Sequence, residues 1–239
     1  MVLQFLIIYL KFFILKIFKM NDKSKFEIAY NDPKLYFIYN NLKKIKNVKI
    51  LELGVRHGIS TSLFLKLCEE NDGKLVSVDI ENYGHLYKNT KWNFIHSRDD
   101  NFKKIDNEIY KMGGLDVLYI DSFHEPGHVK KIFYHYYKLL NKDGLIFIDD
   151  INWLPYAKFS QRESSGMFEA NYQTFNKLLE IKFNNNEKFN LEFSFENSGT
   201  AKIKKNNNTE LNEPKKIKKI ISLKTLLLLA FRKLKNNFC

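Results

Sequence analysis

Cysteine is nearly absent from this sequence of 239 residues. The two cysteines that occur, Cys68 and Cys239, form no spacing pattern of a disulfide framework or a metal site. We expect both to be free thiols in a reducing cytoplasm. Hydrophobic residues make up 44% of the chain, which is enough for the core of one domain with extensions.

A net positive charge is missing from the centre of the chain, although the formal net charge of the whole is +12. Three of these charges lie in residues 1–19 and nine in residues 200–239, so residues 20–199 are neutral overall. Proteins that bind nucleic acid carry a basic patch on the folded domain. We therefore expect no nucleic acid partner for the folded centre of this chain.

The apolar N-terminus lacks the features of a secretory signal. In residues 1–19 no positive residue precedes the apolar run, no small-residue cleavage site follows it, and Lys11 and Lys16 interrupt it. Two interpretations stay open. The segment is a helix that anchors the protein in or on a membrane, or it is an extension of the gene model ahead of a true start at Met20.

The C-terminus lacks an apolar run long enough to span a bilayer, since its longest extends only from Leu226 to Phe231. After a linker over residues 206–214, residues 215–239 place isoleucine, leucine and phenylalanine mostly on one side of a predicted helix that lysines flank. Such a basic amphipathic helix binds an anionic membrane surface, which would hold a cytoplasmic protein at the membrane periphery. The alternative is a helix that docks on the protein's own surface, with its lysines in solvent.

The most informative stretch that is present runs from Val48 to Ser60. An apolar strand carries Glu52 near its end, and Gly54 and Gly58 precede the hydroxyl that opens a helix. Glycine permits backbone angles that a side chain forbids, and serine or threonine suits a helix N-cap. The pattern predicts a buried strand, a tight turn and a helix N-terminus, where a ligand can approach bare backbone.

A second predicted strand, residues 74–79, ends in Asp79. In nucleotide-binding α/β folds an acid roughly twenty residues after the glycine turn reaches the ribose hydroxyls. The turn itself has the spacing Glu-x-Gly-x-x-x-Gly-x-Ser and lacks the Gly-x-Gly-x-x-Gly of dinucleotide-binding enzymes. The sequence therefore disfavours an NAD-dependent enzyme, which we keep as one alternative.

Strands and helices alternate through the centre of the chain. We expect helices over residues 33–46, 60–70, 102–112, 125–140 and 166–183, and strands over residues 48–53, 74–79, 92–96, 115–121, 144–150, 188–195 and 200–204. The alternation indicates right-handed crossovers and a parallel sheet, and the last two strands form an antiparallel hairpin. We expect a doubly wound, mostly parallel seven-stranded α/β sheet, in a domain over residues 20–205.

Acidic residues fall at the predicted carboxyl ends of the parallel strands, where ligands bind in such sheets. They are Glu52, Asp79, Asp99, Asp121 and Asp149. Carboxylates suit a hard cation such as Mg²⁺, which would hold a substrate hydroxyl and lower its pKa while a nearby base removes the proton. His124 is the candidate base, with Asp121 beside it. The plainer interpretation is that the aspartates cap loops and the histidine faces solvent.

Residues 48–155 resemble a class I S-adenosylmethionine-dependent methyltransferase. The branch concerned includes small-molecule O-methyltransferases and the cephalosporin hydroxylase-like and macrocin O-methyltransferase-like proteins, whose first motif is similar to residues 52–60. In that branch the fourth strand often ends Ile-Asp-Gly-x-His, which residues 120–124 match except for Ser122 in place of glycine. A later Leu-x-x-Gly-Gly-x-x-x-x-x-Asp block is similar to residues 140–150.

The resemblance implies a site for S-adenosylmethionine and a candidate site for Mg²⁺. The implied cofactor residues are Glu52, Gly54 and Gly58 at the methionine part, Ser60 at the start of the next helix, Asp79 at the ribose hydroxyls and Asp99 near the adenine. The implied ligands of Mg²⁺, where a family member has one, are Asp121, Asp149 and Asp150.

The activity implied by the resemblance is transfer of a methyl group to a hydroxyl of a small molecule or a glycan. The aromatic-rich segment over residues 153–168 is expected to form a lid over the acceptor. A non-catalytic scaffold that keeps the methyltransferase fold is the second alternative.

Overall fold

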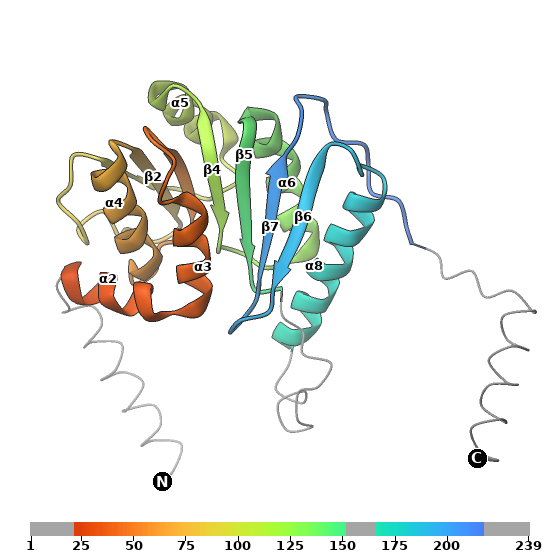
Figure 1. Ribbon diagram of the computed structural model, residues 1–239, viewed down its shortest axis with the longest axis horizontal. Coiled ribbons are helices and arrows are strands. Elements are labelled where there is room, and N and C mark those ends of the chain that lie inside the picture. Colours follow the sequence, from red (N-terminus) through yellow and green to blue (C-terminus); the bar gives the residue numbers. More distant parts are fainter. Residues whose placement is uncertain (1–21, 152–165, 218–239) are drawn as a thin grey trace, which may run out of the picture.

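The computed structural model describes residues 22–151 and 166–217, in which helices cover both faces of one sheet (Figure 1). The apolar segment over residues 1–19, most of the expected lid and the C-terminal helix beyond residue 217 lie outside these ranges, so they stay predictions. Residues 206–217 form neither helix nor strand. No helix in the described ranges combines the length and the apolar character needed to cross a bilayer.

The seven strands form one sheet in the order β3-β2-β1-β4-β5-β7-β6. The strands are β1 (Lys49–Leu53), β2 (Lys74–Asp79), β3 (Trp92–His96), β4 (Leu115–Ile120), β5 (Leu140–Asp149), β6 (Phe189–Ser194) and β7 (Thr200–Lys205). Pairing is parallel from β3 to β5, whereas β7 runs antiparallel to both β5 and β6. The predicted doubly wound sheet with its C-terminal hairpin is confirmed, and the strand order reverses between β1 and β4, where such sheets bind ligands.

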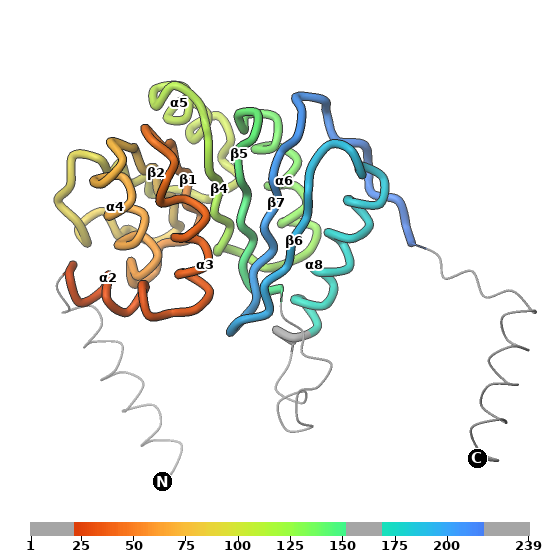
Figure 2. Tube along the Cα trace, viewed as in Figure 1, coloured from red at the N-terminus to blue at the C-terminus, as the bar shows by residue number. Residues whose placement is uncertain are grey.

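Each face of the sheet is buried under three of the described helices. The helices are α2 (Asp22–Asn31), α3 (Pro33–Leu42), α4 (Ile59–Asn71), α5 (Phe102–Met112), α6 (Pro126–Leu139) and α8 (Gly166–Phe183). Apolar residues of α2, α3 and α4 form the core on one face, and those of α5, α6 and α8 form the core on the other. The trace in Figure 2 shows α2 and α3 on the same side of the sheet as α4.

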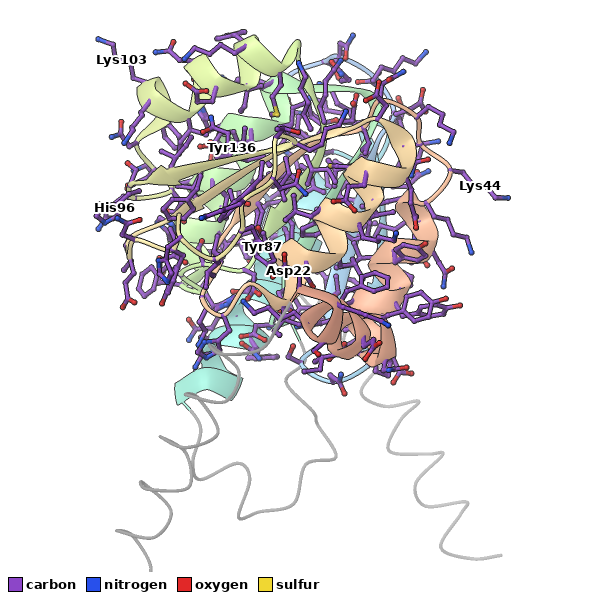
Figure 3. The ribbon with its side chains drawn as sticks, turned by 90° about the vertical axis from the view of Figure 1, so that its left-hand side faces the viewer. Asp22, Lys44, Tyr87, His96, Lys103 and Tyr136 are labelled. Carbon is purple, nitrogen blue, oxygen red and sulfur yellow. The ribbon has the colours of Figure 1, made fainter. Side chains whose placement is uncertain are left out.

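Side chains of the central strands alternate between these two cores. Leu51 and Leu53 belong to the core under α5, α6 and α8, while Ile50 belongs to the core under α2, α3 and α4. Tyr136 is buried in the core under α5, α6 and α8, and Tyr87 is buried in the core under α2, α3 and α4. Figure 3 labels both residues. Burial on both faces explains why the parallel strands have nearly continuous apolar sequences.

The largest differences from the expected elements concern α2, α3 and β5. Helix α2 was not predicted, because only Lys25 and Ala29 of its residues are buried and the sequence has little apolar periodicity there. Helix α3 ends at Leu42 and not at residue 46. Strand β5 begins at Leu140, four residues before the predicted start at Gly144, since a register shift against β4 extends the pairing.

The turn between β1 and α4 depends on two glycines. Gly54 has a φ of +97°, and a Cβ atom placed on it would lie 2.1 Å from the backbone oxygen of Asp121. Gly58, with a φ of +74°, is the N-cap of α4 and caps it with no side-chain hydrogen bond. The expectation that Ser60 or Thr61 caps this helix is wrong, because the hydroxyls of both residues donate to Glu52.

We expect Gly54→Ala to destabilise the fold by about 3 kcal/mol or more, since left-handed backbone costs roughly 1–2 kcal/mol and the overlap with β4 adds a further 1–3. The change is measured as the free energy of unfolding in urea. Gly113→Ala is the matched control, because Gly113 has a φ of +85° but its Cβ atom would meet nothing nearer than 3.9 Å. Equal losses in the two variants would contradict the close approach of the turn to β4.

Candidate functional site

A cavity of about 550 Å³ opens at the carboxyl ends of β1, β2, β3 and β4. Its wall is made by residues that follow these four strands. They are Gly54, Arg56, Val78, Asp79, Ile80, Glu81, Tyr83, Ser97, Arg98, Asp99, Asp121, Ser122, Phe123 and His128. Of the residues expected at a cofactor, Gly54, Asp79 and Asp99 lie in this wall, whereas Glu52, Gly58 and Ser60 lie outside it.

Asp79 joins the end of β2 to the turn after β1. Its Oδ2 accepts hydrogen bonds from the backbone N–H groups of Val55, at 2.8 Å, and Arg56, at 3.2 Å. Its Oδ1 accepts one from the N–H of Glu81 at 3.0 Å. A carboxylate has about four lone-pair positions, so Asp79 keeps the capacity to accept a further hydrogen bond from a molecule in the cavity.

Asp99 is buried in the cavity wall and connects three segments. Its Oδ2 accepts a hydrogen bond from Ser122 Oγ at 2.5 Å and lies 2.8 Å from His128 Nε2. The exposed ring of Phe123 packs edge-on against His128. Sequence reasoning identified Asp99 but missed His128, whose pairing joins residues 29 positions apart and leaves no local signal.

Glu52 is fully buried beneath the turn. It accepts hydrogen bonds from Ser60 Oγ at 2.7 Å, Thr61 Oγ1 at 2.8 Å and Ser77 Oγ at 2.6 Å. Burial raises the pKa of Glu52 to about 7, although the three hydroxyls favour the ionised form and limit the rise. Glu52 and Ser60 therefore hold the turn between β1 and α4 from inside.

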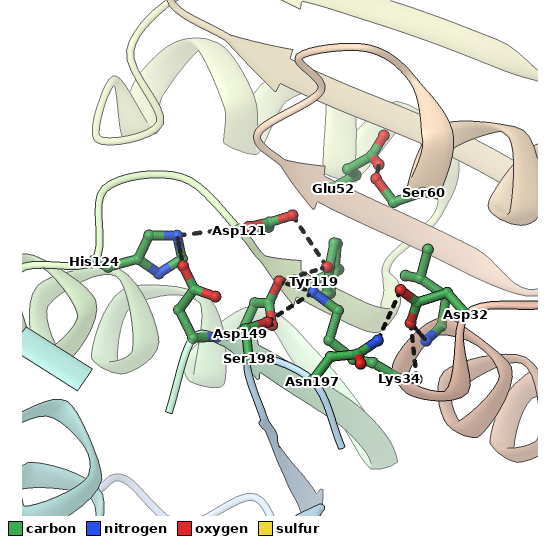
Figure 4. A network of polar contacts seen from close by, with 12 residues as sticks. Asp32, Lys34, Glu52, Ser60, Tyr119, Asp121, His124, Asp149, Asn197 and Ser198 are labelled. Atoms are coloured by element: carbon green, nitrogen blue, oxygen red, sulfur yellow. Dashed lines mark hydrogen bonds and ion pairs between the residues drawn. The ribbon is translucent and has the colours of Figure 1, made fainter. Parts of the chain in front are cut away.

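The predicted catalytic residues lie at the ends of β4 and β5, in an acidic cluster made of Asp121, Asp149, Asp150, His124 and Tyr119 (Figure 4). His124 Nε2 is 3.5 Å from Asp121 Oδ1 and 3.4 Å from Asp150 Oδ2. The Tyr119 hydroxyl lies 3.1 Å from Asp121 Oδ2 and 3.2 Å from Asp149 Oδ2. Asp121 also lines the cavity, so it connects the acidic cluster to the cavity.

Burial and neighbouring charges together change the titration of this cluster. Burial raises the pKa of Asp121 to about 6; the neighbouring Asp149 adds to the rise and His124 opposes it. Burial alone would lower the pKa of His124, but Asp121 and Asp150 outweigh it and raise that pKa. The carboxylates therefore stabilise the protonated form of His124.

Lys34 reaches the same cluster from α3. Its Nζ donates to Asp149 Oδ2 and, at 3.1 Å, to Ser198 Oγ in the turn between β6 and β7. Burial opposes the charge on Lys34, but Asp149 and Asp121 outweigh it and raise the pKa of the ammonium group. Sequence reasoning missed this residue, because 115 positions separate it from Asp149.

The three aspartates expected to bind Mg²⁺ come together but do not fit the ion in this arrangement. Lys34 Nζ donates to Asp149 Oδ2, while Ser198 Oγ, at 3.1 Å, and the N–H of Asp150, at 2.8 Å, donate to Asp149 Oδ1. Both oxygens of Asp149 are thereby engaged. Over residues 22–151 and 166–217, no three His, Cys, Asp or Glu side chains converge as a metal site requires.

A family model for a methyltransferase domain matches residues 51–151. This range contains the glycine turn, the cavity wall and the acidic cluster, but not Lys34. No curated protein sequence matches the chain.

Solved structures share the fold at low sequence identity. MycE methyltransferase from the mycinamycin biosynthetic pathway, in complex with Mg, SAH and mycinamycin VI, is 20% identical with a TM-score of 0.56, over 82% of this chain and 57% of MycE. The SAH-bound methyltransferase PaMTH1 of Podospora anserina is 16% identical with a TM-score of 0.55, over 78% and 88% of the two chains. A putative caffeoyl-CoA O-methyltransferase from Staphylococcus aureus is 18% identical with a TM-score of 0.52, over 71% and 81%. The chain thus spans little more than half the length of MycE.

The buried Glu52 makes stability depend on pH. Its pKa is about 7 in the fold against an ordinary 4.5, so the folded state holds this proton more tightly than the unfolded state does. The stability it contributes is complete below about pH 4.5 and is lost as the pH rises through about 7, by up to about 3 kcal/mol. Glu52→Gln, which is isosteric, is expected to flatten this loss in urea unfolding measured from about pH 5 to 8.

The exposed Glu69→Gln is the control and should keep the slope of the natural protein. An unchanged slope in Glu52→Gln would contradict the assignment of a raised pKa to Glu52.

Proposed function

We propose that the chain is a class I S-adenosylmethionine-dependent methyltransferase that methylates a hydroxyl of a small-molecule or glycan acceptor. The observation that carries the proposal is the shared position of Asp121. It lines the cavity at the strand-order reversal and also belongs to the acidic cluster that contains a histidine. A methyl donor in the cavity and a hydroxyl at the cluster would therefore meet beside Asp121.

In this proposal the cavity holds S-adenosylmethionine. Gly54 lines the cavity where the methionine part would lie, and its missing Cβ lets the turn pack directly against the backbone of Asp121. Asp79 accepts a hydrogen bond from a ribose hydroxyl with its remaining lone pair, and the buried Asp99 lies near the adenine. Glu52 and Ser60 do not contact the cofactor but stabilise the conformation of the turn between β1 and α4. The neighbours MycE and PaMTH1, which were solved with SAH bound, support this choice of cofactor.

The transfer needs positioning and one proton acceptor. S-adenosylmethionine, when bound, would supply an electrophilic methyl group to the acceptor oxygen, with S-adenosylhomocysteine as the leaving group. The imidazole of His124 takes the hydroxyl proton, and Asp121 and Asp150, which face its Nε2, stabilise the imidazolium that forms. We include no metal step, because both oxygens of Asp149 are engaged by groups of the protein.

The acceptor class follows from the same groups. Carboxylates and a histidine bind hydroxyls through hydrogen bonds, and such bonds suit the dense hydroxyl groups of a sugar or a polyhydroxylated natural product. MycE, whose complex contains mycinamycin VI, supports this class.

We expect S-adenosylhomocysteine to bind the full chain with micromolar affinity, and Asp79→Asn to weaken binding by about tenfold or more, since it removes a charged acceptor of the ribose hydroxyls. Calorimetric titration measures both affinities. Asp72→Asn, which removes a charge from an exposed residue away from the cavity, is the control. Tight binding of NAD without binding of S-adenosylhomocysteine would favour the NAD-dependent alternative.

We expect His124→Gln to lower methyl transfer by about a hundredfold or more while S-adenosylhomocysteine still binds, because the variant loses the base but keeps the cavity. Transfer from labelled S-adenosylmethionine is measured with a panel of macrolide, monosaccharide and phenolic acceptors. The exposed His85→Gln is the control. A natural protein that binds the cofactor but methylates no member of the panel would favour the non-catalytic scaffold.

A further inference from the structure

Lys34 is the one described cation in hydrogen-bond contact with the acidic cluster apart from a protonated His124. Its side chain is 14% exposed and that of its partner Asp149 only 2%. Figure 4 shows the ammonium group among Asp149, Ser198 and the Tyr119 hydroxyl. At this degree of burial, either charge would be costly to keep without the other, because no solvent would compensate it.

The position of Lys34 is fixed from two sides. Asp32 caps the N-terminus of α3 by accepting hydrogen bonds from the N–H groups of Lys34, at 2.8 Å, and Leu35, at 3.1 Å. The same carboxylate accepts a hydrogen bond from Asn197 Nδ2 at 3.0 Å, in the turn between β6 and β7. Ser198, the next residue of that turn, contacts both Lys34 and Asp149. The start of α3 and the turn between β6 and β7 therefore hold the ammonium group against Asp149.

The charges of the cluster require such a cation. Asp121, Asp149 and Asp150 lie around Tyr119 and His124 at distances of 3.1–3.5 Å. Carboxylates that share Tyr119 and His124 as partners repel one another, and the Lys34 ammonium on Asp149 offsets part of this repulsion. A divalent cation and the Lys34 ammonium cannot both occupy Asp149 Oδ2.

We propose that the Lys34 ammonium is the built-in cation of the acceptor site and takes the place that a divalent metal ion would occupy at Asp149. Lys34 acts as a positioning residue: it holds Asp149, and through the Tyr119 hydroxyl it fixes Asp121 at the cavity wall. The proposal concerns the acceptor half of the proposed function, and it makes methyl transfer by this chain independent of divalent metal.

The test uses Mn²⁺ alone as the probe, titrated into the full chain and followed by the loss of its electron paramagnetic resonance signal. The natural protein is expected to bind no Mn²⁺ at Asp149. Lys34→Met, which keeps most of the aliphatic stem, is expected to gain binding by at least about tenfold, because removal of one positive charge leaves the carboxylates unpaired. Adding Asp149→Asn to Lys34→Met should abolish the gain.

The matched control is Lys44→Met, which removes a charge from an exposed lysine just after α3, at the edge of the molecule in Figure 3. It should bind no more Mn²⁺ than the natural protein. Lys34→Arg, which retains the cation, should do the same. Circular dichroism checks that each variant is folded. If Lys34→Met does not fold, Lys34→Gln takes its place. If Lys34 served only in packing, its replacement by methionine would not create a binding site for Mn²⁺.

Equal Mn²⁺ binding by the natural protein and by Lys34→Met, or no binding by either folded Lys34 variant, would overturn the proposal. Titration of S-adenosylhomocysteine into the same proteins separates this inference from the proposed function. Lys34 does not itself line the cavity, so its variants should still bind the cofactor product, and any loss of affinity should be limited to the contribution of Asp121. A natural protein that fails to bind it would count against methyl transfer and leave the Mn²⁺ result unaffected.

Discussion

The buried carboxylate of Glu52 joins the three elements on which the site is built. It lies on β1 and accepts hydroxyl hydrogen bonds from α4 and from Ser77 on β2. These bonds hold the glycine turn against the end of β4, where the N–H of Asp121 donates to Leu53 O at 2.8 Å. The turn can lie this close to the end of β4 because Gly54 has no Cβ atom, which would lie 2.1 Å from the backbone oxygen of Asp121. The buried Glu52 thus holds in place a turn that lines the cavity.

The two halves of the site have different origins in the chain. The cavity and the aspartates come from strand ends within the matched domain, over residues 51–151. The cation comes from α3, before that domain, and its support comes from the turn between β6 and β7, after it. Asp121 belongs to both halves. Under the proposed function, the matched domain would hold the cofactor, and the segments that flank it would supply the cation on the acceptor side.

The sequence predicted the parts of the molecule that local patterns determine. Continuous apolar runs located the parallel strands, and the acid at each strand end fell at the ligand-binding edge because parallel strands all end there. The roles of single residues were harder to predict. Glu52 is buried and not at the cavity wall, and Lys34 and His128 found partners across the fold. Such pairings depend on tertiary packing, and the local periodicity of a sequence does not reveal contacts between distant residues.

The measurement that tests the account most directly is a crystal structure of the full chain grown with S-adenosylhomocysteine and Mn²⁺. The account predicts S-adenosylhomocysteine between Gly54, Asp79 and Asp99, with its sulfur toward Asp121, and the Lys34 ammonium on Asp149 with no anomalous signal from manganese there. Cofactor bound elsewhere, or a manganese ion on Asp149 with Lys34 turned away, would contradict it.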